Sequence, residues 1–320
     1  MYIKTDKKAF SLLELIFVIV ILGIVSSIGS GIIAQIYENY IVQRAMHRVS
    51  LKTELAATQI ANRLAYRINS SVITRDVANS ITPLEDVTFG ASDLNAETLE
   101  WIGYDNDSFS ARARPGWSGY CDTNTTTSAI TNPGRNRIHT PGSRLRFTNA
   151  VIRNLSSNTK TIADTALFFS TNGIFFDDGN PGGRIRQRPQ CYGFEENNAT
   201  CVHRISRRIG NRTLQTDDNM LSGTQISQHY KLAWSAYALV PVNVQSTRLF
   251  DLALRYNYQP WDRTYHYSNG TSQSILIRNV SSFKFSEQGG TVRFKLCATE
   301  QIGDANTTNI SVCKEKVVIR

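Results

Sequence analysis

Proline is absent from Phe10 to Thr82, and histidine and cysteine each occur only five times in this chain of 320 residues. The histidines are scattered, with no H-E-x-x-H pair of the kind that binds catalytic zinc. The chain lacks a G-x-x-x-x-G-K-[ST] phosphate-binding loop, and Gly116-Trp117-Ser118-Gly119 is not the G-x-S-x-G nucleophile elbow. These absences exclude the main motif-bearing enzyme classes, and the sequence predicts no catalytic site and no cofactor.

Standard metal-ligand spacings are missing as well. Asp177-Asp178-Gly179-Asn180 lacks the alternating ligands of an EF-hand loop, so a tight turn is the better interpretation. Cys191, Cys201 and His203 lie close together, but their spacing fits no standard zinc pattern. The sequence therefore predicts no metal site.

A long apolar segment is present near the N-terminus. It runs from Leu15 to Val25 without a charge and continues to Ile36. From Phe10 to Ile36 it is long enough to cross a hydrocarbon core of roughly 30 Å as a helix. Lys4, Lys7 and Lys8 precede it, which places the N-terminus in the cytoplasm and the rest of the chain outside the inner membrane.

Glu14 is the unexpected residue of this segment. A carboxylate at membrane depth costs at least about 2.5 kcal/mol unless it is paired, so it indicates a functional site. Cleavage between Ala9 and Phe10 would supply a partner, the new α-amino group of Phe10. Two plainer interpretations are a secretory signal peptide cut near Ser26 to Gly31 and an unprocessed single-pass anchor. Neither of them explains Glu14.

The order Lys7-Lys8-Ala9-Phe10-Ser11-Leu12-Leu13-Glu14-Leu15 resembles the prepilin-type cleavage and methylation signature of type IV pilins and type II secretion pseudopilins. The resemblance implies cleavage after Ala9 by a prepilin peptidase and methylation at Phe10. It also implies a charge pair between Glu14 and the Phe10 amine of a neighbouring subunit, which sets axial register. The implied partners are other pilins or pseudopilins, bound through the N-terminal helix, and an inner-membrane assembly platform.

Two features depart from that signature. The family usually has Gly before the cut, where this chain has Ala9, and it often has Pro within the membrane helix, where this chain has Gly29 and Gly31. Glycine weakens a helix by about 1 kcal/mol relative to alanine, so these two residues mark a segment able to unwind.

Amphipathic periodicity continues beyond the membrane segment. Apolar residues recur in steps of mostly three or four, with charges between them, at Ile41, Val42, Ala45, Met46, Val49, Ala56, Ile60, Leu64 and Ile68. This pattern predicts one helix from Phe10 to about Asn69, roughly 90 Å long. The alternative is a membrane helix followed by a separate packing helix, with a bend near Gly29 to Gly31.

The remaining residues show frequent turn signals and the alternation of apolar and polar residues that is typical of a β-rich region. Strands are predicted at Leu145–Val151, Ala166–Phe169, Gly173–Phe176, Lys231–Val244, Leu249–Tyr258, Ser274–Arg278, Val280–Phe285, Thr291–Cys297 and Glu315–Ile319. The segment from Val280 to Cys297 reads as a hairpin closed at Gly289-Gly290. The predicted fold is α+β, a long N-terminal helix on a domain with an antiparallel sheet, divided into a leader (1–9), a membrane half-helix (10–36), an amphipathic half-helix (37–70) and an exported region (71–320).

The cysteines of an exported domain are candidates for oxidation. Pairing Cys191 with Cys201 would close a short loop, and pairing Cys297 with Cys313 would link the last strands, leaving Cys121 over. Spacing alone does not fix this connectivity.

The net charge is +9, and removing the leader, with three lysines and one aspartate, leaves about +7. Arginines cluster at two places: Arg184, Arg186 and Arg188, then Arg204, Arg207, Arg208 and Arg212. Such clusters can neutralise phosphates, and tyrosines interleaved with basic residues between Arg255 and Tyr267 suggest base stacking. Solvated loop arginines and ordinary strand tyrosines are the plainer interpretation.

These patterns together predict a structural pilin-like subunit, a minor one at the tip of a pilus or pseudopilus, with its large domain in the periplasm or in an extracytoplasmic filament. Two alternatives stay open. One is a filament-displayed module that binds DNA or surfaces through Arg204, Arg207, Arg208 and Arg212, and the other is a membrane-tethered enzyme. Secretion, adhesion, motility and DNA uptake are equally compatible with the sequence.

Overall fold

The structure is a computed structural model that describes residues 11–69, 71–89, 98–110, 114–122, 136–169, 175–176, 184–185, 192–194, 202–217, 227–246, 248–262, 267–268, 271–302 and 308–319. The chain divides into two units. One comprises Met1–Leu51 and Thr299–Val312, and the other comprises Lys52–Ala298 and Cys313–Arg320.

The first element is a single long helix, α1 (Leu12–Leu64), of 53 residues. It runs without interruption through Gly29 and Gly31, which confirms the prediction of a long apolar N-terminal helix. A Cβ atom added at either glycine would meet no heavy atom within 4 Å. The packing of the described residues therefore does not require glycine at these positions.

Within the first unit, burial along α1 begins late. Ala45 and Val49 are buried, whereas the large apolar side chains from Leu12 to Ile36 are exposed. Arg48 Nη1 lies 3.4 Å from Glu300 Oε1 at the surface of this unit.

Within the second unit, the last turns of α1 present a buried face. Ala56, Ala57, Ile60 and Leu64 are each at most 1% exposed and follow helical steps of one, three and four residues. Glu54, half-buried beside this face, pairs with Lys314 at 3.7 Å and with Lys316. The hydrogen bond from Lys316 lowers the pKa of the Glu54 carboxyl, against a smaller opposing effect of burial.

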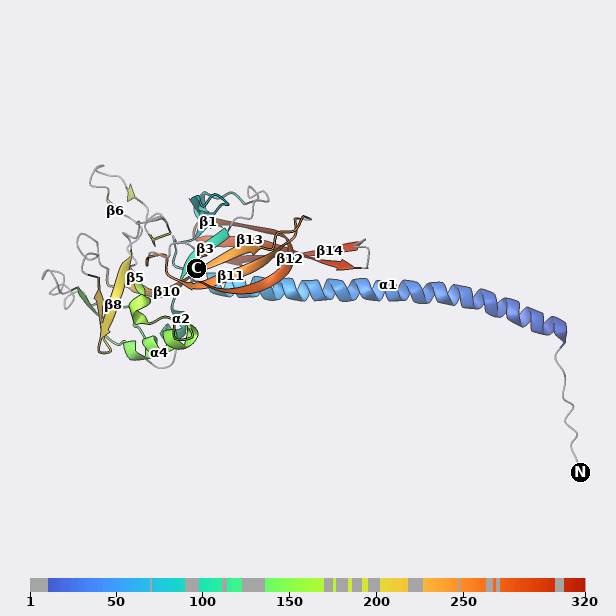
Figure 1. The fold of residues 1–320 in the computed structure, drawn as a ribbon, viewed down its shortest axis with the longest axis horizontal. Helices are drawn as coiled ribbons and strands as arrows, with labels where there is room; N and C mark the ends of the chain where they lie inside the picture. Colours follow the sequence, from blue (N-terminus) through green and yellow to red (C-terminus); the bar gives the residue numbers. More distant parts are fainter. Residues whose placement is uncertain are drawn as a thin grey trace, which may run out of the picture. The chain divides into compact units, whose positions relative to one another are not determined.

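The strands of the described residues form one twelve-stranded sheet and a separate β6–β7 pair. The strand order is β14-β13-β12-β11-β10-β5-β8-β9-β4, with β3 also paired to β10 and β1 lying between β2 and β3 (Figure 1). Every pairing whose register is given is antiparallel. The strand bounds are β1 Ile73–Arg75, β2 Ile81–Pro83, β3 Thr98–Tyr104, β4 Arg137–His139, β5 Ala166–Phe169, β6 Phe175–Phe176, β7 Arg184–Ile185, β8 His203–Ile209, β9 Thr213–Thr216, β10 Tyr230–Val242, β11 Phe250–Tyr258, β12 Ser272–Gln288, β13 Thr291–Ile302 and β14 Thr308–Val318.

Short helices complete the second unit. They are α2 (Asn106–Phe109), α4 (Leu145–Leu155) and the 3₁₀ helices η1 (Leu84–Asp86) and η2 (Ile162–Asp164). α4 lies beside the β8–β9 hairpin, where the Leu145 N–H donates to the Asn211 carbonyl at 3.1 Å (Figure 1).

Apolar cores lie on both faces of the sheet at β5. Ala166 and Phe168 join a cluster with Ile73, Ile102 and Trp261, whereas Leu167 and Phe169 join one with Ile138, Leu145 and Leu214. Successive strand residues point to opposite faces, so a strand in which all four residues are buried must be covered on both sides. This double burial explains why β5 reads as a continuous apolar run.

The strand predicted at Leu145–Val151 is wrong, because these residues begin helix α4. The buried side chains Leu145, Thr148 and Ile152 follow steps of three and four, while the Asn149 side chain accepts a hydrogen bond from the Ile162 N–H at 3.0 Å. The strand-like alternation of Leu145, Phe147 and Val151 was therefore coincidental.

The C-terminal hairpin is present and longer than predicted. β12 and β13 pair with Phe285 opposite Phe294, and Gly289 and Gly290 form the turn with φ of 60° and 79°. Positive φ at both positions is the reason why glycine is needed here. The two strands predicted on either side of Asn279 form one strand, β12, whose register against β11 shifts between Ile277 and Val280.

Arg67 fixes the end of α1 to the sheet. Its side chain is 1% exposed and donates to three backbone carbonyls, those of Leu64 at 2.9 Å, Gly290 at 2.5 Å and Val318 at 3.2 Å. These carbonyls belong to the helix C-terminus, the β12–β13 turn and the last strand. One guanidinium thus joins three segments that are distant in sequence.

We expect Arg67→Met to lower the free energy of unfolding by about 3 kcal/mol, because the three buried carbonyls would lose a charged donor. Urea unfolding of the detergent-solubilised chain, followed by tryptophan fluorescence, measures the effect. Arg63→Met is the matched control, since Arg63 is exposed in the same turn and lies over Tyr237 with its Cζ 5.4 Å from the ring centroid. Equal losses for the two variants would show that Arg67 has no special role.

Candidate functional site

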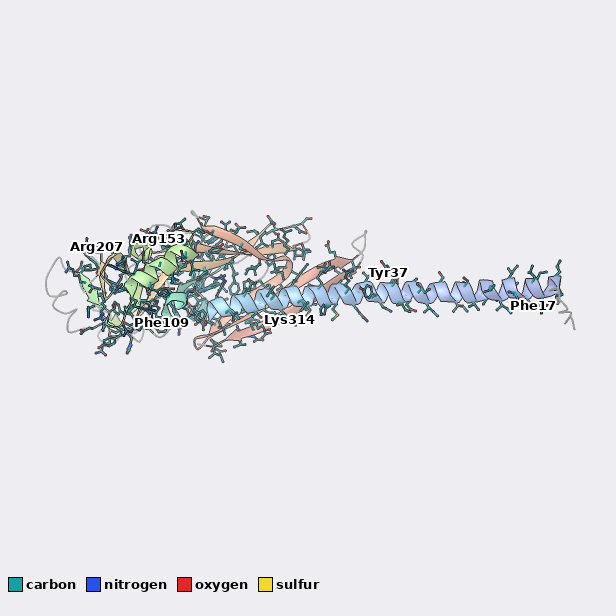
Figure 2. All side chains as sticks on the ribbon, turned by 90° about the horizontal axis from the view of Figure 1, so that it is seen from below. Phe17, Tyr37, Phe109, Arg153, Arg207 and Lys314 are labelled. Carbon is teal, nitrogen blue, oxygen red and sulfur yellow. A yellow bond between two sulfur atoms is a disulfide. The ribbon has the colours of Figure 1, made fainter. Side chains whose placement is uncertain are left out.

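The first half of α1 is an apolar surface that no described residue covers. Phe17 is 60% exposed and Tyr37 is 64% exposed, and their side chains project outward from the helix (Figure 2). Among the described residues, α1 is the only helix long and apolar enough to cross a membrane. Exposed apolar area of this extent is stable in lipid or against other proteins rather than in water.

Glu14 lies in the first turn of this helix and is exposed among apolar neighbours. Its backbone N–H donates to the Ser11 hydroxyl at 3.3 Å, so Ser11 caps one of the unpaired N–H groups of the helix start. An acid at this end also interacts favourably with the helix dipole. Ala9 and Phe10 lie outside the described residues, so the charge pair between Glu14 and the Phe10 amine stays a prediction.

The comparison with known families concerns the same segment. Residues 4–30 match the family model described as the prokaryotic N-terminal methylation motif. The chain carries a type IV pilin-like signal. This finding confirms the resemblance drawn from residues 7–15, and it supports prepilin cleavage, methylation and a membrane-anchoring helix. No curated protein and no solved structure matches the chain.

The pilin-like signal covers 27 of the 320 residues, and the remaining candidate residues belong to the large region that follows it. A disulfide joins Cys297 of β13 to Cys313 of β14, sixteen residues apart in sequence. Cys121 is fully buried in the cluster that contains Trp117 and Tyr230. Cys191 and Cys201 lie outside the described residues, so their pairing stays a prediction.

The four arginines of the second cluster differ in their surroundings. Arg204 is engaged by two acids, with Nη2 2.5 Å from Asp262 Oδ1 and Nε 3.5 Å from Asp217 Oδ2. Arg207, Arg208 and Arg212 lie on the β8–β9 hairpin. Arg207 Nε donates to Gln215 Oε1 at 2.8 Å, and Arg208 Nη1 donates to the Gly210 carbonyl at 3.0 Å. In the other cluster, the side chains of Arg184, Arg186 and Arg188 are not among those described.

The described part of the tyrosine-rich segment is divided between core rings and the half-buried Tyr256 and Tyr267. Tyr258 is 1% exposed and Trp261 is 3% exposed, because both fill the core beside Phe168. Residues 263–266, which complete the predicted aromatic run, lie outside the described residues. Sequence alternation alone could not show which rings face inward.

Two buried carboxylates have raised pKa values, a common property of catalytic acids. Burial raises the pKa of Glu100, although Arg75 Nε lies 2.6 Å from its Oε1 and the Tyr258 hydroxyl donates to its Oε2 at 3.2 Å. Arg75 Nη2 also donates to the Phe194 carbonyl at 3.2 Å. The acid is therefore enclosed by partners that join β1, β3 and β11, an arrangement that serves packing.

Asp105 is the second of these acids. Burial raises its pKa to about 6. Its Oδ1 accepts the Ser108 N–H at 3.2 Å at the start of α2, its Oδ2 accepts the Ser108 hydroxyl, and its own carbonyl accepts the Trp117 indole N–H at 2.9 Å. Asp105 thus caps a short helix against the core. The described residues contain no group of three or more His, Cys, Asp or Glu side chains arranged to hold a metal ion.

Because the folded-state pKa of Asp105 is raised, the folded protein binds more protons than the unfolded chain between about pH 4 and pH 6. Its contribution to stability is therefore greatest below pH 4 and is lost as the pH rises to 6. The loss is about 3 kcal/mol for a shift from 3.8 to about 6.

We expect Asp105→Asn to gain stability relative to the wild type by about this amount between pH 4 and pH 7. The measurement is the urea midpoint of both proteins as a function of pH. Asp107→Asn is the control, since Asp107 is exposed in the same turn. A stability difference between Asp105→Asn and wild type that does not vary with pH would refute the raised pKa of Asp105.

The disulfide gives a further expectation. Replacing Cys297 and Cys313 together by serine should lower the free energy of unfolding by about 3 kcal/mol, the entropic effect of opening a loop of roughly 15 residues. Reduction of the wild type should give the same urea midpoint as the double variant. Two different midpoints would show that the serine hydroxyls disturb the packing on their own.

Proposed function

We propose that the chain is a minor structural subunit of a pilin-like filament, a pilus or a pseudopilus, cleaved after Ala9 and assembled through the first half of α1. The observation that carries the proposal is the methylation motif at residues 4–30, which leads into an apolar helix surface uncovered by the described residues. Other pilins or pseudopilins would cover this surface in the filament. The prepilin peptidase and an inner-membrane assembly platform would be the other partners.

Glu14 would determine the register of assembly. A carboxylate and an amine attract strongly in a low dielectric, and a subunit shifted along the axis would leave both of them unpaired. This ion pair fixes the position of the subunit along the filament axis more than it strengthens its attachment. The exposed position of Glu14 in the first turn of α1 leaves its carboxylate accessible to the amine of a neighbouring subunit.

The size of the region after the helix supports a minor subunit. A compact domain of about 250 residues has a radius of gyration of roughly 18 Å, which is large for a subunit repeated along a thin filament. A position at the tip removes this restriction, because only one neighbour must be accommodated below. The buried acids are enclosed by structural partners, which favours a non-catalytic role.

Membrane topology follows from the charges around the helix. The leader lysines would stay in the cytoplasm, and the large domain would lie in the periplasm or in an extracytoplasmic filament.

We expect Glu14→Ala to leave membrane insertion and cleavage intact and to reduce incorporation into sheared filaments at least tenfold, since 1.4 kcal/mol already corresponds to that factor. Mass spectrometry of the protein from its native host reports cleavage and methylation at Phe10, and immunoblots of the filament fraction report incorporation. Glu38→Ala is the matched control, an exposed acid further along the same helix.

Each part of the proposal can fail separately. Normal incorporation of Glu14→Ala would refute the charge pair while leaving the processing pathway in place. A wild-type chain that starts near Ser30 would identify an ordinary secreted protein. An intact Met1 would identify an unprocessed anchor.

A further inference from the structure

An exposed arginine row crosses the small sheet of β4, β9 and β8. Gln215 of β9 lies opposite Arg137 of β4 on one side and opposite Arg207 of β8 on the other. Directly opposed residues point to the same face, so both arginines flank Gln215. Both are exposed, whereas the neighbouring Ile138 and Leu214 point into the core. At about 4.8 Å between strands, the two arginines are roughly 10 Å apart at the backbone.

The row continues at the end of the β8–β9 hairpin. Gly210, at φ 64°, forms the turn with Asn211, and the Thr140 N–H donates to the Arg212 carbonyl at 2.7 Å. The Arg146 N–H donates to Asn211 Oδ1 at 3.2 Å, which places the first turn of α4 against the same turn. Arg212 and Arg146 thereby join the row, whereas Arg208 lies opposite the buried Leu214 and so belongs to the other face. The arginine face is defined as Arg137, Arg146, Arg207 and Arg212.

The face keeps its positive charge. In the part of the chain that the structure describes, none of its four arginines forms an ion pair, in contrast to Arg204 with its two aspartates. Arg207 projects from the surface (Figure 2). Arg204 and Arg208 of the sequence cluster are therefore not part of the face, whereas the strand register adds Arg137 and the contact of α4 with Asn211 adds Arg146.

The chemistry of the face favours a linear phosphate polymer. Arginine binds phosphate in a bidentate manner through its planar guanidinium. Four arginines spread over a sheet face and a neighbouring helix cannot converge on one small anion, but they can follow a chain of phosphates. Duplex DNA presents one negative charge per roughly 1.7 Å of its axis and releases counterions when arginines bind.

Two other polyanionic partners fit less well. Single strands bind by stacking on exposed rings, and Tyr258 and Trp261 are buried. Surface binding to lipid uses apolar side chains beside the cations, and none of the described large apolar side chains of β4, β8 and β9 is exposed. We propose that the arginine face binds the phosphate backbone of duplex DNA, independently of base sequence. This inference does not depend on assembly into a filament.

The test compares two double variants of the full-length, detergent-solubilised chain. Arg207→Gln with Arg212→Gln removes two charges from the face, and Arg248→Gln with Arg278→Gln removes two exposed arginines elsewhere. Binding to a fluorescent 30-base-pair duplex is measured by anisotropy at several salt concentrations. We expect the first variant to bind about tenfold more weakly at 100 mM salt and to flatten the log–log salt slope by about two, with the control unchanged.

A charge-conserving variant separates charge from folding. Arg207→Lys with Arg212→Lys should restore most of the affinity, because lysine also neutralises phosphate. Equal weakening in both glutamine variants would overturn the proposal in favour of diffuse net charge. Absence of duplex binding at 50 mM salt would overturn it as well. Binding to phosphatidylserine vesicles that exceeds binding to the duplex would assign the face to a membrane instead.

Discussion

The buried guanidinium of Arg67 is the constraint on which the second unit depends. Burying a guanidinium is costly inside a protein, and here three backbone carbonyls accept hydrogen bonds from it. One of them, Leu64, belongs to the C-terminal end of α1, where the helix dipole is negative and favours a cation. The other two come from the β12–β13 turn and from β14. The helix can therefore end correctly only where the sheet is already complete, so local and long-range structure are specified together.

Much of the fold could be predicted from local patterns. The absence of proline and the spacing of Ala56, Ile60 and Leu64 were sufficient for the helix, and paired glycines at 289 and 290 were sufficient for the β12–β13 hairpin. β3 was missed because Glu100 interrupts its apolar pattern, and Arg75 and Tyr258, from other strands, make that acid acceptable in the core. α4 was misread because seven residues can satisfy a period of two by chance, and burial by η2 and β9 decided the outcome.

The candidate site residues were also predictable only where a local sequence pattern identified them. Glu14 could be identified from sequence because the segment that follows it carries no charge from Leu15 to Val25, so an acid beside it needs a functional reason. The arginine face could be identified only in part, because Arg137 and Arg207 are 70 positions apart and meet through the register of β9. Arg204 had the right residue type in the right segment, but Asp262 and Asp217 neutralise it. The sequence shows where the arginines are, whereas their ion pairs in the folded protein decide which of them can bind a phosphate.

The ion pair between Lys316 and Glu54 spans 262 residues, and the disulfide at Cys313 holds the same strand in place. Contacts of such high sequence separation form late, because a long loop must close before they are rewarded. Lys316 is synthesised 262 residues after Glu54. The last turns of α1 therefore wait for this support until β14 has emerged from the ribosome. A nascent chain that carries the complete helix but lacks β14 would keep one side of that helix without its final partner.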